Sequence, residues 1–168
     1  MIIGGQAVLL YGSPRLTVDI DVTLGIGAEK LPLVVDLLRE IDLTIIPENL
    51  TEFVGETSVL PAKDELTGIR VDFIFSFTPY EQRAIKRAND ITFGDVKVKF
   101  ASVEDIIIHK IFASRPRDIE DVRSILLKNR DIDIEYIKEW LKEFSASMEG
   151  YTDFSETFEA LMEETKQL

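Results

Sequence analysis

The segment from Thr17 to Leu24 limits the fold more strongly than any other part of this chain. Polar and apolar residues alternate strictly along it, which indicates a β-strand with one polar face. Because successive side chains of a strand point to opposite faces, Asp19 and Asp21 lie on the same face, about 7 Å apart. Two such carboxylates repel each other unless a cation lies between them, and hard oxygen ligands suit Mg²⁺ or Mn²⁺. The alternative is an edge strand with a solvated polar face.

A pair of glycines ahead of this strand indicates an anion site. The short apolar stretch Met1–Ile3 runs into Gly4 and Gly5, and residues 6–11 have helical composition. Glycine lets the backbone approach a ligand closely, and the N–H groups at a helix N-terminus point toward an anion. Gly4 and Gly5 are therefore candidate contacts for a phosphate group.

A third acid lies on a later strand pattern. Within Thr67–Phe75, Arg70 and Asp72 share one face, and the other face carries the apolar residues Ile69, Val71, Phe73 and Phe75. If this strand neighbours the first, Asp72 completes a three-carboxylate cluster, an arrangement that holds metal ions for an in-line phosphoryl displacement. One acid would act as general base on an acceptor hydroxyl, and the metals would neutralise the triphosphate and the leaving pyrophosphate.

The remaining hydrophobic patterns divide the chain into two regions. Residues 1–100 are predicted to form an α/β (α+β) core, a mixed sheet flanked by helices, and residues 101–168 a helical region packed on that core. Two hairpins are expected, within residues 57–76 and 91–100. The expected helices span residues 28–41, 79–89, 102–114, 116–128, 133–144 and 151–166.

Composition narrows the function classes. The 168 residues carry 31 acids and 19 bases, a net charge of −12, which argues against wrapping a long nucleic acid because phosphate neutralisation needs many Lys and Arg. The charge does not exclude a protein that docks the end of one RNA or binds an NTP with its metal. The absence of Cys excludes disulfides and zinc-thiolate sites. The opening apolar stretch is too short for a membrane span and lacks a signal-peptide pattern, so we expect a cytoplasmic protein with no membrane association.

These motifs, in this order, resemble the polymerase-β-like nucleotidyltransferase superfamily. Its signature is a hydrophobic residue, Gly, then Gly or Ser, a spacer of about a dozen residues, an acid-hydrophobic-acid strand and a later third acid. Ile3-Gly4-Gly5, Asp19-Ile20-Asp21 and Val71-Asp72-Phe73 reproduce it. The segments Gly4–Ala7 and Tyr11–Thr17 look closest to the group around the AbiEii toxin. That group also carries a downstream Lys, an Arg, a basic-Asp pair and a further Asp, which match Lys110, Arg115, Arg117-Asp118 and Asp121.

The resemblance implies a role for each matching residue. Asp19, Asp21 and Asp72 would be the catalytic residues and would hold Mg²⁺ or Mn²⁺. The implied nucleotide contacts are Gly4 and Gly5 at the triphosphate, Ser13, Arg15 and Thr17 at the rim, and Lys110 at a phosphate, with Arg115 and Asp118 as accessory residues.

Three assignments have alternatives. Gly12-Ser13 could itself be the glycine-serine element, although it lies too close to Asp19 for the superfamily spacing. Arg15 could be an ordinary surface charge. The charged residues around Asp118 and Asp121 could form a salt-bridged helix junction without a role in binding.

The implied activity is transfer of a nucleoside monophosphate from an NTP to an acceptor hydroxyl. RNA such as tRNA, or protein, is the implied acceptor, and the chain would be a toxin with an antitoxin partner. The alternatives are a non-catalytic nucleotide-binding or antitoxin-like module and a nucleotidyltransferase for a small molecule such as an antibiotic. Family members usually carry a helix ahead of the first strand, whereas this strand begins at Met1. Either the true start lies upstream, or an uncovered sheet face favours a partner or a homodimer.

Overall fold

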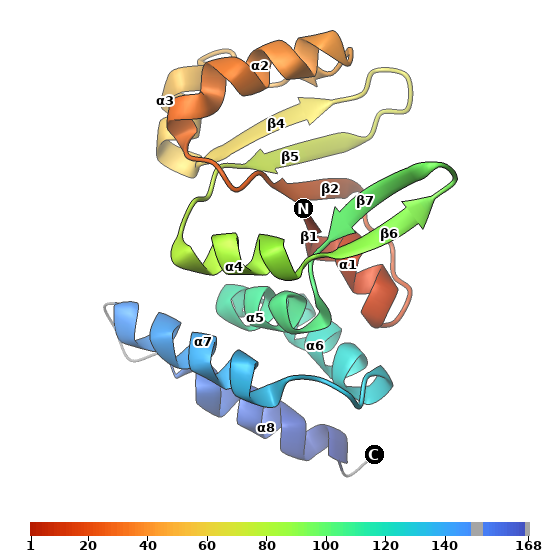
Figure 1. Ribbon diagram of the computed structural model, residues 1–168, viewed down its shortest axis with the longest axis vertical. Helices are drawn as coiled ribbons and strands as arrows, with labels where there is room; N and C mark the ends of the chain where they lie inside the picture. The colour runs from red at the N-terminus through yellow and green to blue at the C-terminus, as the bar shows by residue number, and fades with distance from the viewer. Residues whose placement is uncertain (149–152, 167–168) are drawn as a thin grey trace. The chain divides into compact units, whose positions relative to one another are not determined.

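The computed structural model describes residues 1–148 and 153–166 and divides the chain into two compact units (Figure 1). The first unit contains Met1–Gln6 and Leu16–Ala101, and the second contains Ala7–Arg15 and Ser102–Leu168. The chain therefore leaves the first unit inside helix α1 (Gly4–Tyr11), returns ahead of the acidic strand, and leaves it again after Ala101.

A mixed seven-stranded sheet forms the centre of the first unit, in the order β3-β4-β5-β2-β1-β7-β6. The pairs β2/β5 and β1/β7 are parallel, and the other neighbours are antiparallel. The fold is thus α/β, a mixed sheet flanked by helices with further helices in the C-terminal part, as the sequence predicts. The strands are β1 (Ile2–Ile3), β2 (Asp19–Thr23), β3 (Thr44–Ile45), β4 (Val59–Lys63), β5 (Arg70–Ile74), β6 (Asn89–Phe93) and β7 (Val96–Phe100).

The pairing of β2 with β5 brings the predicted acids together. Its register places Asp21 beside Asp72 and Asp19 beside Arg70. Directly paired residues on neighbouring strands point to the same face of a sheet, so these four side chains share one face. The prediction of a three-carboxylate cluster depended on these two strands being neighbours, and they are.

The other face of this part of the sheet is apolar and carries helix α2 (Leu31–Glu40), and Val54 of helix α3 (Leu50–Thr57) packs into the same buried cluster (Figure 1). Burying one aliphatic side chain contributes about 1.5–3 kcal/mol, so these apolar residues determine which face of β4 and β5 turns inward. The acidic face must then be the opposite one, because a shift of one residue would exchange the two faces. The buried cluster consists of Val34, Val35, Leu38, Val54, Leu60, Ala62 and Phe75.

The elements differ from the sequence prediction in four main places. Strand β2 is shorter than the predicted Thr17–Leu24, and α1 begins at Gly4 instead of at residue 6. The predicted helix over residues 28–41 opens with a 3-10 turn, Ala28–Lys30, and becomes α-helical at Leu31, where the following proline suits a first helical turn. Helix α3 was not predicted. Helix α4 (Pro79–Arg87) matches its prediction closely.

The second unit is helical and includes the end of α1. Ser102 caps α5 by accepting a hydrogen bond from the N–H of Asp105, and Pro116 begins α6, as the sequence predicts. The predicted helix over residues 151–166 begins at Phe154, and its first two predicted residues lie outside the described residues. The four helices are α5 (Val103–Ala113), α6 (Pro116–Lys128), α7 (Ile134–Ser147) and α8 (Phe154–Lys166), and α5 contacts the other three.

Candidate active site and family

The three aspartates of the first unit form a cluster that can hold a metal ion. Each of Asp19, Asp21 and Asp72 offers a carboxylate oxygen, and these oxygens lie within 4.8 Å of one another. All three residues are partly buried. Oxygen-only donor sets of this kind suit Mg²⁺ or Mn²⁺ better than Zn²⁺, which favours nitrogen and sulfur ligands. The arrangement therefore fits a divalent cation of the hard type.

Gly4 makes room for one of these carboxylates. It has a φ of 62°, a left-handed conformation that glycine adopts without steric cost. A Cβ atom at this position would lie 1.9 Å from Oδ2 of Asp21. Gly4 also begins helix α1, so its N–H and those of the next residues have no partner within the helix. A glycine here thus places the N-terminus of α1 against the acidic cluster.

The polar neighbours of Asp19 come from α1 and from the segment just ahead of β2. The side-chain amide of Gln6 donates to the carbonyl of Asp19, at 3.4 Å. The hydroxyl of Thr17 lies 3.4 Å from a carboxylate oxygen of Asp19. Thr17, which the sequence places at the rim of the nucleotide site, is therefore in contact with one of the acids.

Arg70 forms an ion pair with one member of the cluster, Asp72. Its Nε and a terminal nitrogen donate to the two oxygens of Asp72, at 2.7 and 3.0 Å. These hydrogen bonds hold the pKa of Arg70 above its ordinary value, and the charges of Asp72, Asp19 and Asp21 add to the shift. The Arg70 side chain is 51% exposed, so it can turn away from Asp72 into solvent. A cation bound by Asp72 would replace this ion pair.

The second unit gathers the predicted basic residues around two buried acids. The Lys110 ammonium lies 2.6 Å from Asp118 and 3.0 Å from Asp121. Arg15 donates two hydrogen bonds to Asp121, at 2.8 and 2.9 Å. The side chains of Lys110, Asp118 and Asp121 are 11%, 7% and 5% exposed. These contacts are those expected of a salt-bridged helix junction. The role of Lys110 and Arg15 in nucleotide binding stays a prediction.

Further contacts fasten the segment around Ser13 to helix α6. The N–H of Ser13 donates to Ser124, and Lys128 donates to the carbonyl of Gly12. Arg115, predicted as accessory, is 81% exposed and lies 3.9 Å from Asp118. Gly4, Gly5, Thr17 and the three aspartates thus belong to the first unit, whereas Ser13, Arg15, Lys110, Arg115 and Asp118 belong to the second.

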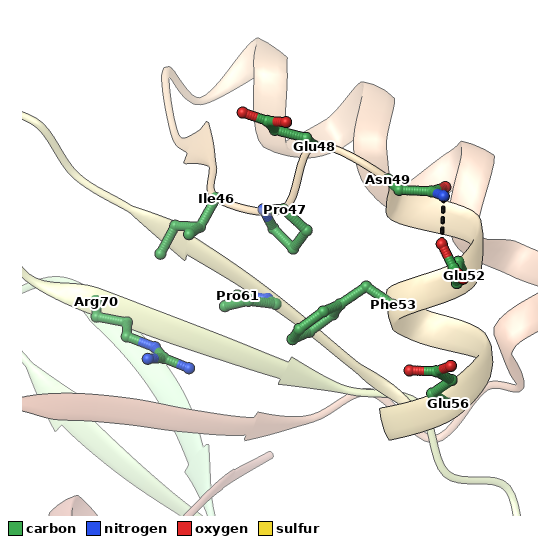
Figure 2. A pocket seen from close by; sticks show the side chains of 9 residues that line it. All are labelled: Ile46, Pro47, Glu48, Asn49, Glu52, Phe53, Glu56, Pro61 and Arg70. Carbon is green, nitrogen blue, oxygen red and sulfur yellow. Dashed lines mark hydrogen bonds between the residues drawn. The ribbon is translucent and has the colours of Figure 1, made fainter.

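A pocket of about 430 Å³ opens in the first unit beside β4 and α3 (Figure 2). Sequence reasoning missed it because helix α3 was not predicted. The available signal was Asn49 followed three residues later by Glu52, a helix-start pattern. Asn49 does donate to Glu52, as the dashed line in Figure 2 marks. The lining residues are Ile46, Pro47, Glu48, Asn49, Glu52, Phe53, Glu56, Pro61 and Arg70.

Comparison with known proteins decides the family. A sequence profile of the family described as "Nucleotidyltransferase of unknown function (DUF6036)" matches residues 1–166. The chain belongs to this family. This family is described as a nucleotidyltransferase family, and nucleotidyltransferases use an NTP as substrate. The match confirms the predicted resemblance to nucleotidyltransferases in general. The AbiEii group is a finer assignment that the match leaves as a prediction.

A solved structure shows the same fold. The chain is similar to an antigenic nucleotidyltransferase-like protein from Paracoccidioides brasiliensis, with 20% sequence identity and a TM-score of 0.52. The similarity covers 86% of this DUF6036 chain and 78% of the other. No curated protein matches the chain. None of the helices within the described ranges is long and apolar enough to cross a membrane.

Proposed function

We propose that this DUF6036 protein transfers a nucleoside monophosphate from an NTP to an acceptor hydroxyl. The observation that carries the proposal is the cluster of Asp19, Asp21 and Asp72 on one face of two neighbouring parallel strands. Family membership and fold support the reaction class. The acids supply the oxygen ligands that such a transfer needs around the triphosphate.

Each side chain of the cluster has a stated role in this proposal. Asp19 and Asp21 hold Mg²⁺ or Mn²⁺ from β2, and Asp72 completes the ligand set from β5. A divalent cation at this position supplies charge neutralisation for the reacting phosphates. Asp72 also accepts the proton of the acceptor hydroxyl. Arg70, which pairs with Asp72 in the structure, releases that carboxylate when the cation binds.

The triphosphate lies at Gly4 and Gly5 in this proposal. The N–H groups at the start of α1 have no helical acceptor, and the positive end of the helix dipole favours an anion. Ser13, Arg15, Thr17 and Lys110 remain proposed nucleotide contacts, with Arg115 and Asp118 as accessory residues.

The AbiEii resemblance adds an acceptor and a biological role to the proposal. RNA such as tRNA, or protein, would accept the nucleotide, and the chain would act as the toxin of a toxin-antitoxin pair. An antitoxin or a second copy of the chain would then be its partner. These finer assignments have the sequence motifs as their only support.

Label transfer from α-labelled NTPs tests the reaction. Wild-type protein with Mg²⁺ or Mn²⁺ is expected to label an acceptor in a mixture of tRNA, proteins and small hydroxyl compounds. Asp21→Asn should abolish labelling while the fold survives by circular dichroism. Asp36→Asn is the matched control, since Asp36 is 71% exposed on α2 and forms an ion pair with the exposed Arg39. Full activity of Asp21→Asn would refute the assigned role of the cluster.

The non-catalytic alternative predicts a different result. Metal-NTP binding without label on any acceptor, together with a tight complex with another protein, would support a binding module. Calorimetry with Mg²⁺-NTP, run beside the labelling assay, separates the two functions.

A further inference from the structure

The pocket beside α3 lies on the same face of the sheet as the acidic cluster. Pro61 of β4 lines the pocket and is paired directly with Asp72 of β5, so the two side chains share a face about 5 Å apart. Arg70 also lines the pocket and binds both oxygens of Asp72. Two lining residues of the pocket, Pro61 and Arg70, are thus direct neighbours of Asp72 in the acidic cluster.

Strand order places this pocket and Gly4 on opposite sides of the cluster. Along the sheet, β1 and the start of α1 lie on one side of β2, whereas β5 and then β4 lie on the other. Gly4 faces Asp21, and Pro61 faces Asp72. In phosphoryl transfer the attacking and leaving oxygens are roughly in line on opposite sides of the phosphorus. With the triphosphate at Gly4, the pocket occupies the acceptor side.

The walls of the pocket select against an anion. Glu48, Glu52 and Glu56 line its α3 side, and Figure 2 shows them across the pocket from Arg70. Arg70 is the one basic residue among those that line the pocket, and it already forms an ion pair with Asp72. A triphosphate or a nucleic-acid backbone in this pocket would meet three carboxylates, so the charges favour a cation.

Helix stability accounts for Glu52, which lies in the first turn of α3 and accepts a hydrogen bond from Asn49, but not for Glu56. Glu52 and Glu56 lie four residues apart on α3, where like charges destabilise a helix. Glu56 also lies in the last turn, where the helix dipole disfavours an acid. The floor of the pocket is apolar, with Phe53 reaching from α3 toward Pro61 (Figure 2). Carboxylates around an apolar floor suit a ligand with protonated amines on a carbon skeleton.

We propose that this pocket binds the acceptor, and that the acceptor is a small hydroxyl-bearing amine. The proposal rests on the proposed nucleotidyltransferase function and names its acceptor class, in place of the RNA or protein acceptor that the AbiEii resemblance implies. The amine groups pair with Glu48, Glu52 and Glu56, and a volume of about 430 Å³ is sufficient for a small molecule. The hydroxyl oxygen forms a bond to the α-phosphorus of the NTP, and its proton passes to Asp72. The bond from that phosphorus to the bridging oxygen breaks, so pyrophosphate leaves and a phosphodiester of the amine results.

Calorimetric binding of 1,3-diaminopropan-2-ol tests the pocket without any turnover. Glu52→Gln/Glu56→Gln removes two pocket charges. The matched control, Glu139→Gln/Glu143→Gln, removes two from α7, outside the pocket, and changes the net charge equally. We expect the pocket variant to bind the diamine at least about tenfold more weakly than wild type and the control to change less than about twofold. Equal weakening in both variants would show binding by overall charge and would overturn the proposal.

Label transfer then tests the acceptor. With α-labelled NTP, label is expected on the diamine and not on glycerol, its neutral counterpart, and the pocket variant should lower this transfer. Label on tRNA or protein at an unchanged rate in the pocket variant would overturn the amine proposal and leave the nucleotidyltransferase function standing. No label on any acceptor, with diamine binding intact, would refute the function and with it the acceptor role of the pocket.

Discussion

Replacing Gly4 with Ala tests whether this residue sets the position of a metal ligand. The new Cβ would lie 1.9 Å from Oδ2, 2.8 Å from Cγ and 3.1 Å from Cβ of Asp21, whereas ordinary contacts begin at 3.4 Å. All three atoms of the aspartate are too close, so a small rotation of the carboxylate does not relieve the overlap. Asp21 must turn away from the cluster or the start of α1 must move.

The substitution is expected to have two separate effects, one on the free energy of unfolding and one on metal affinity. Alanine in the left-handed region costs about 1–2 kcal/mol, which lowers the free energy of unfolding whether or not a metal is bound. Misplacing a metal ligand typically costs about 10–100-fold in affinity, since ligand orientation depends on such supporting contacts. That factor corresponds to about 1.4–2.8 kcal/mol of lost metal binding.

Gly94→Ala separates these effects. Gly94 has a φ of 59°, close to the 62° of Gly4, and a Cβ there would meet no atom within 4 Å. Urea unfolding without metal should show a loss of about 1–2 kcal/mol in Gly94→Ala and a larger loss in Gly4→Ala, where the overlap with Asp21 adds to the backbone cost. Calorimetry with Mn²⁺ should show about 10–100-fold weaker binding in Gly4→Ala alone. Wild-type Mn²⁺ affinity in Gly4→Ala would refute the argument that Gly4 sets the position of a metal ligand, because Asp21 would then either keep its place or not be a ligand.

Two further predictions concern stability. Lys110→Met leaves Asp118 and Asp121 buried without their shared ammonium, so urea unfolding should show a loss of about 3–5 kcal/mol, against almost none for the exposed Lys142→Met; a loss below about 1 kcal/mol would contradict this prediction. Hydrogen bonds from the Thr67 hydroxyl and the Leu66 N–H hold the pKa of Asp64 below its ordinary value of 3.8. Because the folded pKa is lowered, the stability that this carboxylate contributes is present above about pH 4 and is lost as the pH falls through the lowered pKa. Wild type should therefore be more stable than Asp64→Asn at pH 6 in thermal unfolding, and the difference should shrink as the pH falls through the lowered pKa, whereas a constant difference would exclude this linkage.

The acidic cluster was predictable because a strand has a fixed period of two. Alternation along residues 17–24 and 67–75 is enough to place Asp19 and Asp21 on one face, and Asp72 on the polar face of its own strand. The helix starts at Ser102 and Pro116 were predictable for a similar reason, since capping depends on neighbours within a few residues. Local rules of this kind need no tertiary information.

Other features depend on contacts between distant residues. Arg70 was recognised on the face of Asp72, but its neighbour Asp19 comes from a strand about fifty residues earlier, and only the sheet pairing brings them together. Helix α3 was missed because its apolar content is low over eight residues, and packing of Val54 against β4 and α2 stabilises it. The pocket that α3 helps to form was therefore invisible in the sequence.

The sequence by itself determined the chemistry of this protein: three acids on polar strand faces, a glycine pair ahead of them, and the nucleotidyltransferase class to which they point. Tertiary structure decided which groups meet. It placed Gly4 against Asp21, paired Arg70 with Asp72, and surrounded Lys110 with two buried acids. The physical reason is that side-chain direction follows from local backbone geometry, whereas a charge finds its partner only when burial of apolar faces has brought distant segments together.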